Sequence, residues 1–184
     1  MSKDDKTNGK APEENGQENH AGAVPVTIHA QYIRDLSFEN PNAPESLRAG
    51  QKPPEMEINI GMDARKIPSD QIQNLYEVVL NVRAVARRES DTVFIADLQY
   101  GVTVSIHEKV PEDNHHPILL IEIPRLAFPF ARQILAAVTV QSGFPPLMLN
   151  PIDFQSLYTE RYKEEIAQAR EKAKQQQEDT VESS

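Results

Sequence analysis

The chain has 184 residues, which suits one domain with tails, and its 28 Asp and Glu against 19 Lys and Arg give a formal net charge of −9. This acidic balance argues against nucleic acid as the main partner, because phosphate binding requires concentrated Lys and Arg. The chain contains no cysteine, which excludes disulfides, thiol nucleophiles and zinc sites built on thiolates.

Both ends of the chain are polar and predict tails. Residues 1–23 are rich in Lys, Glu, Asp, Asn and Gly, and residues 168–184 form a charged tail. Such segments bury too little apolar surface to offset the entropy of ordering, so we expect disorder. The first twenty residues lack the apolar core of a secretory signal, and no segment approaches the ~18 apolar residues of a membrane span. We therefore expect a cytoplasmic protein with no membrane insertion, whose domain covers residues 24–167.

Four segments of this domain alternate apolar and polar residues with the period of a strand. They cover about residues 26–32, 56–62, 76–87 and 92–106. One polar face on each segment is typical of an antiparallel sheet that is wetted on one side. In the first strand, the apolar face is expected to carry Val26, Ile28, Ala30 and Tyr32.

The connections between these strands differ in length. Residues 39–55 form a long loop with four prolines, which cannot join a ladder, so we expect the loop to cross over the sheet or its edge. Residues 32–44, which lead into it, are interpreted as a strand that leaves the sheet and enters a proline turn. Only Arg88–Asp91 separates the third strand from the fourth, which predicts a hairpin.

Two helices are predicted after the strands. The first covers about Ala127–Gln141, with Pro129 in its first turn and Gly143 beyond its end. The second begins at Asp153, a good N-cap residue. Strands followed by helices indicate an α+β fold, in which a four-stranded antiparallel sheet has two C-terminal helices packed on one face. The core of such a fold is thin, so we expect oligomerisation to complete it. The apolar stripe of the first helix is assigned to Leu126, Phe130, Ile134, Ala137 and Val138.

Residues that support catalysis are scarce. The chain has no phosphate loop and only 7 glycines, and no pair of carboxylates indicates acid–base chemistry. His115 and His116 lie among polar residues and are interpreted as a solvated loop rather than a metal site, because no third ligand is evident. His29 is assigned to the polar face of the first strand. We therefore expect no enzyme activity, no metal and no cofactor.

Four blocks of the sequence are more specific. They are YIRDLSFENPNAP at residues 32–44, YEVVLNV at 76–82, LAFPFAR at 126–132 and GFPPLMLNP at 143–151. In this order they closely resemble SecB, the family of bacterial protein-export chaperones, and the resemblance runs from about residue 26 to residue 162. It implies an ATP-independent holdase that keeps precursor proteins unfolded and delivers them to SecA, the motor ATPase of the export channel.

The resemblance also implies a homotetramer that is built as a dimer of dimers. The first strands, here Val26–Tyr32, would pair across a dimer, which removes an aggregation-prone open edge. Three residues on the apolar side of the fourth strand match positions where assembly of the family is sensitive, and each alone is also consistent with the core of a single chain. They are Ala96, Leu98 and Tyr100.

In the family, non-native precursors bind in long apolar grooves that are formed by the crossover loop, the second strand and the last helix. Methionine and aromatic side chains offer adaptable contacts that tolerate many client sequences. The family's crossover loop often carries a tryptophan; this chain has none, and Lys52 lies near that position. For any single groove residue, ordinary core packing is equally consistent. The matching residues are Leu47, Met56, Ile58, Ile60, Phe128, Phe130, Leu157 and Tyr158.

A second surface that the resemblance implies binds SecA. In the family it is an acidic patch on the open face of the sheet, which receives the motor's basic, zinc-containing C-terminal segment; the zinc belongs to the motor. Ile95 and Asp97 have the same parity on the fourth strand, so both are expected to point away from its apolar side. The four matching residues are Asp35, Glu39, Ile95 and Asp97.

Two alternatives stay open. The nearer one is a SecB-like chaperone dedicated to a client outside export, such as an antitoxin, and binding to SecA discriminates between the two roles. The more distant one is an α+β domain that binds a small molecule between its sheet and helix. A stoichiometric metabolite that survives purification would indicate the second alternative.

Overall fold

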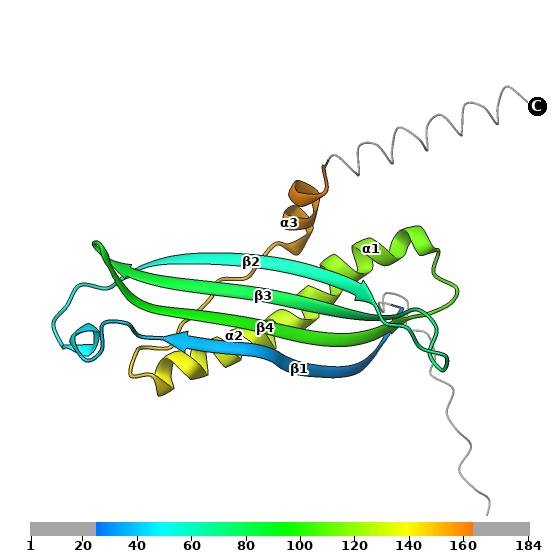
Figure 1. The fold of residues 1–184 in the computed structure, drawn as a ribbon. Coiled ribbons are helices and arrows are strands. Elements are labelled where there is room, and N and C mark those ends of the chain that lie inside the picture. Colours follow the sequence, from blue (N-terminus) through cyan, green and yellow to red (C-terminus); the bar gives the residue numbers. More distant parts are fainter. Residues whose placement is uncertain (1–24, 164–184) are drawn as a thin grey trace, which may run out of the picture.

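The computed structural model describes residues 25–163. The predicted tails, 1–23 and 168–184, lie outside these residues, as do residue 24 and residues 164–167 of the predicted domain. Figure 1 shows a four-stranded antiparallel sheet with a long helix running obliquely behind it, and this arrangement confirms the predicted α+β class. No helix within the described part of the chain is both long enough and apolar enough to cross a membrane.

The strands are longer than predicted, and their spatial order differs from their order in the chain. They are β1 (Val26–Glu39), β2 (Glu55–Lys66), β3 (Leu75–Arg88) and β4 (Asp91–Ile106), arranged β1-β4-β3-β2. Because β1 and β2 are the two edges, residues 40–54 link one edge of the sheet to the other. The predicted hairpin is confirmed, since Arg88 pairs with Asp91 in register across a two-residue turn.

Strand β1 differs most from its prediction. It does not leave the sheet near Tyr32 but stays paired with β4 as far as Glu39, which lies opposite Ile95. Its register shifts between Ile28 and Ala30 and again between Ile33 and Asp35. Each shift inserts one extra residue and reverses the alternation of faces. Tyr32 therefore lies on the open face of the sheet, away from the helix, whereas the sequence pattern placed it on the apolar face.

The long helix begins twelve residues before its predicted start. A helical run starts with α1 (His115–Pro117), continues through a π-helical segment at Ile118–Glu122, and enters α2 (Ile123–Gln141). Pro129 therefore lies inside α2 and not in its first turn. The predicted end is confirmed, because Gly143 has φ +87° and the N–H of Phe144 donates to the carbonyl of Thr139 at 3.0 Å.

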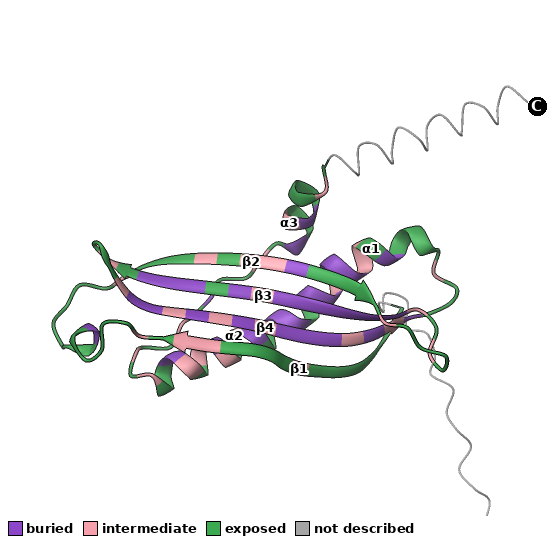
Figure 2. Cartoon of the chain, viewed as in Figure 1, coloured by how far each residue is buried: buried purple, intermediate pink, exposed green. Residues whose placement is uncertain are grey.

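The core lies between the sheet and the long helix. Figure 2 shows buried residues along β3 and β4 and on the inner side of α2. The buried stripe of α2 is not the predicted one, because Leu126 and Phe130 are exposed. The residues of α2 that are buried are Ile123, Pro124, Ala127, Phe128, Ala131, Leu135 and Thr139.

The last helix, α3 (Phe154–Arg161), begins where the sequence predicts. The Asp153 carboxylate accepts a hydrogen bond from the backbone N–H of Ser156 at 3.0 Å, which is the N-cap contact. Phe154 is fully buried, and its ring meets the ring of Phe128 edge to face at 5.8 Å between centroids. The helix is also held to the edge of the sheet, since Arg161 donates to the carbonyl of Met62 on β2 at 2.7 Å.

Candidate functional site

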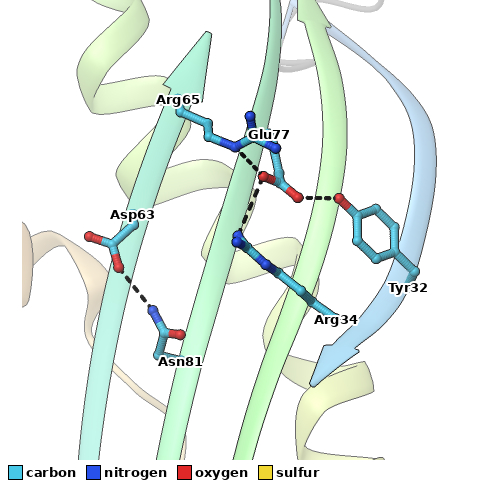
Figure 3. A network of polar contacts seen from close by, with 6 residues as sticks. All are labelled: Tyr32, Arg34, Asp63, Arg65, Glu77 and Asn81. Carbon is cyan, nitrogen blue, oxygen red and sulfur yellow. Dashed lines mark hydrogen bonds and ion pairs between the residues drawn. The ribbon is translucent and has the colours of Figure 1, made fainter. Parts of the chain in front are cut away.

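A buried carboxylate organises the open face of the sheet. Glu77 on β3 is only 4 % exposed, and Figure 3 shows three side chains converging on it. The Tyr32 hydroxyl donates to Oε1, while Arg65 Nε approaches Oε2 at 2.5 Å and Arg34 Nη1 approaches it at 3.5 Å. Since Tyr32 and Arg34 come from β1 and Arg65 comes from β2, one carboxylate ties both edge strands to the centre of the sheet.

The same contacts shift two pKa values. The hydrogen bond from Tyr32, supported by Arg65 and Arg34, holds the pKa of Glu77 below its ordinary value, although burial opposes this effect. Burial, and then the neighbouring Glu77 carboxylate, raise the pKa of the Tyr32 hydroxyl. Both shifts favour a charged Glu77 that accepts from a neutral tyrosine, so the network is intact at neutral pH.

The four residues predicted to bind SecA come together on this open face. Asp35 lies opposite Gln99, and Glu39 lies opposite Ile95, in the pairing of β1 with β4. Asp97 lies between them along β4, opposite Ser37. The register of two strands that are far apart in sequence therefore gathers three carboxylates and one half-buried isoleucine onto one side of the sheet.

A shallow furrow crosses the face at this point. It has a volume of about 500 Å³, and Asp35 and Asp97 both contribute to its lining. Polar side chains from all four strands also line it, namely Ser37, Asn59, Asn81, Arg83 and Gln99, and the rest of the lining is Ile60, Gly61, Val82 and Leu98. Arg83 was not singled out from the sequence, yet its Nη1 lies 2.6 Å from Asp97 Oδ2. Strand parity could place Arg83 on this face, but only the register could place it opposite Asp97.

The residues predicted to bind clients differ in their exposure. Leu47, Met56 and Phe130 are exposed. Phe128 and Tyr158 are buried. The other three are partly buried against the core, namely Ile58, Ile60 and Leu157. On β2, the register places Met56, Ile58 and Ile60 on the helix side of the sheet, opposite Ala86, Ala84 and Val82.

A second apolar surface lies along β1 and the outer side of α2. Phe130 on α2 is 46 % exposed, and its ring lies nearly parallel to that of Tyr100, with 6.3 Å between centroids. The other exposed apolar side chains could not be identified from the sequence, because the pattern does not reveal the register shifts of β1 or the true buried stripe of α2. They are Ile28, Ile33 and Leu36 on β1, and Leu126 and Val140 on α2.

The three residues predicted to affect assembly are buried within this chain. Ala96 and Leu98 belong to the core beneath the helix. Tyr100 is also buried, and its ring contact with Phe130 places it at the margin of the core beside the exposed side of α2. Of the three, Tyr100 is therefore the residue closest to the second apolar surface.

The histidine pair is not in a solvated loop, so that interpretation is wrong. His115 is buried, with Nδ1 3.0 Å from the Tyr76 hydroxyl and Nε2 3.1 Å from the carbonyl oxygen of Val110. Because a carbonyl can only accept, Nε2 carries the proton and Nδ1 accepts from the tyrosine. His116 Nδ1 lies 2.9 Å from the Tyr158 hydroxyl. The pair therefore anchors the start of the long helix and attaches α3 to it.

Comparisons with known proteins agree with this geometry. The family described as "Preprotein translocase subunit SecB" matches residues 18–165. The protein-export protein SecB of Rhodospirillum centenum is 43% identical over 154 residues, which cover 84% of this chain and 89% of that protein. The protein of the same name from Maricaulis maris is 49% identical over 138 residues, covering 75% and 77%.

The fold is also similar to that of a solved chaperone. The SecB-like chaperone of Mycobacterium tuberculosis, solved in complex with a ChAD peptide from the HigA1 antitoxin, superposes with a TM-score of 0.55 at 13% identity, covering 70% of this chain and 88% of that one. The match along the sequence, together with an antiparallel four-stranded sheet backed by a long helix, leads to one conclusion. The chain belongs to the SecB family.

Proposed function

We propose that the chain is an ATP-independent holdase chaperone, which keeps precursor proteins unfolded in the cytoplasm and delivers them to the SecA motor for export. The chaperone domain is the segment 24–167, and the mechanism includes no chemical step and no cofactor. The observation that carries this proposal is the amount of apolar surface that stays accessible on the helix side of a chain belonging to the SecB family.

The exposed apolar side chains lie on both sides of the long helix. Phe130 and Leu126 project from α2, while Ile33 lies on one edge strand and Met56 on the other. Several large apolar side chains exposed on one side of a sheet suggest an interaction surface. An unfolded precursor exposes long apolar segments, whereas a folded protein does not, so such a surface selects unfolded chains without requiring a sequence motif.

Assembly multiplies these contacts. We propose a homotetramer, a dimer of dimers, in which the edge of β1 at Val26–Tyr32 pairs with a second copy. This pairing would occupy the unpaired backbone groups of an open edge strand. A client that touches several apolar surfaces of one tetramer is then held by avidity, even where each contact is weak.

Delivery would use the opposite face. Asp35, Glu39 and Asp97 place three negative charges on the open face, and the half-buried Ile95 beside them offers an apolar contact. A basic segment of SecA fits this combination. Opposite charges steer encounter and set partner choice, and their effect weakens as salt rises. Because clients and the motor would use opposite faces of the sheet, both can be bound at once.

Light scattering tests the holdase activity directly. A chemically denatured protein is diluted into buffer with and without this chain, and aggregation is followed in the absence of ATP. We expect the chain to suppress scattering at near-stoichiometric amounts, and native mass measurement to show a tetramer. Unchanged scattering over a wide range of ratios would contradict the proposal.

The export role is favoured over a dedicated client. Identity to protein-export proteins reaches 43% and 49%, whereas identity to the solved chaperone with an antitoxin peptide is 13%. A direct measurement of SecA binding by the purified protein separates the two roles, because a chaperone dedicated to an antitoxin does not require the motor.

A further inference from the structure

Among residues 25–163, Arg83 is the one basic side chain that lines the furrow of the open face. It lies directly opposite Asp97 in the register of β3 with β4, and its Nη1 is 2.6 Å from Asp97 Oδ2. Its side chain is 51 % exposed and that of Asp97 is 31 % exposed. The contact is therefore short but open to solvent, so a competing cation can reach the carboxylate.

The other two carboxylates of the acidic patch have no such partner. Within residues 25–163, neither Asp35 nor Glu39 forms an ion pair, whereas Asp97 is paired with Arg83. A carboxylate that already accepts from a guanidinium attracts a second cation less strongly. The patch that a basic partner would meet is therefore weaker than its carboxylates alone suggest.

We propose that Arg83 is a resident cation. Its guanidinium binds Asp97 where a basic side chain of the partner would bind, and it is displaced when the partner docks. This inference rests on the proposed docking of SecA at the open face. Arg83 is then a specificity-determining residue, because only a segment with enough positive charge to replace the internal guanidinium gains from Asp97. A segment that offers only one weakly interacting cation does not displace Arg83, so the ion pair of Arg83 with Asp97 stays formed.

The size of the effect follows from the exposure of the pair. Ion pairs that remain open to solvent contribute little, so removal of Arg83 should tighten the binding of SecA by about two- to fivefold. The gain should shrink with rising salt, because it comes from exposed charges.

The chain offers a matched control for the lost charge. Arg87 lies on the same strand and is exposed, but its contact is with the hydroxyl of Thr92, at 3.4 Å, and not with a carboxylate. Arg87→Gln and Arg83→Gln remove the same charge from β3. A comparison of the two variants separates the release of Asp97 from a general increase in negative charge.

The experiment measures the dissociation constant of purified SecA for the full-length protein, at low salt and at about 0.15 M salt. The variants are Arg83→Gln, Arg87→Gln, Asp97→Asn and the double variant Arg83→Gln with Asp97→Asn. We expect Arg83→Gln to bind SecA more tightly than wild type does, and Arg87→Gln to change the binding less. When Arg83→Gln is added to Asp97→Asn, the binding should change by no more than it does for Arg87→Gln. Arg83→Lys, which keeps the charge without the planar fork, should fall between wild type and Arg83→Gln.

The possible failures can be told apart. If wild type binds SecA and Arg83→Gln binds equally or more weakly, the resident-cation role is wrong while the docking proposal stands. Equal tightening by Arg83→Gln and Arg87→Gln also overturns that role, because it shows a general charge effect. If neither wild type nor any variant binds SecA, both proposals fail. Thermal melting of each variant confirms that the fold is retained.

Discussion

The ring of Tyr32 on β1 lies against the α-carbon of Gly101 on β4. The two residues are direct partners in the register of the strands. A β-carbon built on Gly101 would lie 2.6 Å from Cε2 and 2.7 Å from Cζ of the tyrosine ring, which is closer than such atoms approach in folded proteins. The absence of a side chain at Gly101 therefore allows the ring to extend across β4, so that its hydroxyl reaches Glu77 on β3.

This close contact makes Gly101→Ala destabilising. The new methyl group forces the Tyr32 ring aside and weakens its hydrogen bond to Glu77, so we expect a loss of about 1–3 kcal/mol in the free energy of unfolding. Urea denaturation measures this loss. Gly61→Ala on β2 is the control, because the nearest atom to its added β-carbon is 3.6 Å away, an ordinary contact. Equal losses in the two variants would mean that the tyrosine ring moves without cost.

The position of Tyr32 could not be predicted from the sequence. Alternation predicted β3 and β4 to within one residue at each end, because a long uninterrupted alternation leaves little freedom of assignment. Each of the two register shifts of β1 places one extra residue in the strand, and an extra residue leaves no mark on composition. The pattern therefore placed Tyr32 with Val26 and Ile28 instead of with Glu77.

The network around Glu77 predicts a dependence of stability on acid. Its pKa in the folded chain is below the ordinary value of 4.5, so the charged form is favoured by folding. The resulting stabilisation is fully present at neutral pH, and it is lost as pH falls below about 4.5 toward the folded pKa. Glu77→Gln should reduce stability at neutral pH by about 1–3 kcal/mol and should remove this part of the acid transition.

Urea midpoints between about pH 7 and about pH 3 test this prediction. Glu55→Gln is the control, since Glu55 is exposed on β2, and its acid transition should match that of wild type. A Glu77→Gln protein that loses stability with acid as steeply as wild type would show that other carboxylates are responsible.

The start of the long helix shows how packing overrides local signals. Pro117, Pro124 and Pro129 all lie within the helical run, and the sequence-based prediction used Pro129 as a first-turn signal. Burial of Leu120 and Ile123 against the core extends the helix toward its N-terminus, because tertiary packing supplies most of the stability of a helix in a protein. Packing also decides which face of α2 is buried, and Phe130 lies on the exposed face instead of the predicted buried stripe.

Phe130→Ala should weaken client binding without unfolding the chain. The ring is half exposed and contacts Tyr100 on one side, so its loss removes proposed client contact area and only part of a packing contact. We expect weaker suppression of aggregation, by roughly threefold or more, and a loss of stability below the 3–5 kcal/mol that is typical for truncating a buried phenylalanine.

Two variants bracket this prediction. Gln133→Ala changes an exposed polar residue on the same helix and should leave suppression unchanged. Phe128→Ala removes a buried ring that packs on Phe154, and it should lower stability strongly. If Phe130→Ala suppresses aggregation as well as Gln133→Ala does, Phe130 does not contact clients.

Part of the candidate site was predictable because family motifs mark it, and part was not. The sequence blocks at residues 32–44 and 76–82 support the resemblance to the SecB family, which marks Asp35 and Asp97. In the structure, both residues line one furrow. The role of Arg83 depends on which residue lies opposite it. Strand register is a property of the whole sheet, and a shift of one residue would have moved Arg83 away from Asp97.

Reversing the charge at Asp97 should impair SecA binding but leave the holdase activity toward clients. Asp97→Lys places a cation opposite Arg83, so a basic segment meets repulsion where the wild-type protein has a carboxylate; we expect SecA binding to weaken at least tenfold at low salt. Suppression of aggregation should stay within twofold of wild type, because the proposed client surface lies on the helix side. Asp91→Lys makes the same charge change at the first residue of β4, at an exposed position beside the hairpin. It should weaken SecA binding much less. Normal SecA binding by a folded Asp97→Lys protein would show that the open face at Asp97 is not the docking surface.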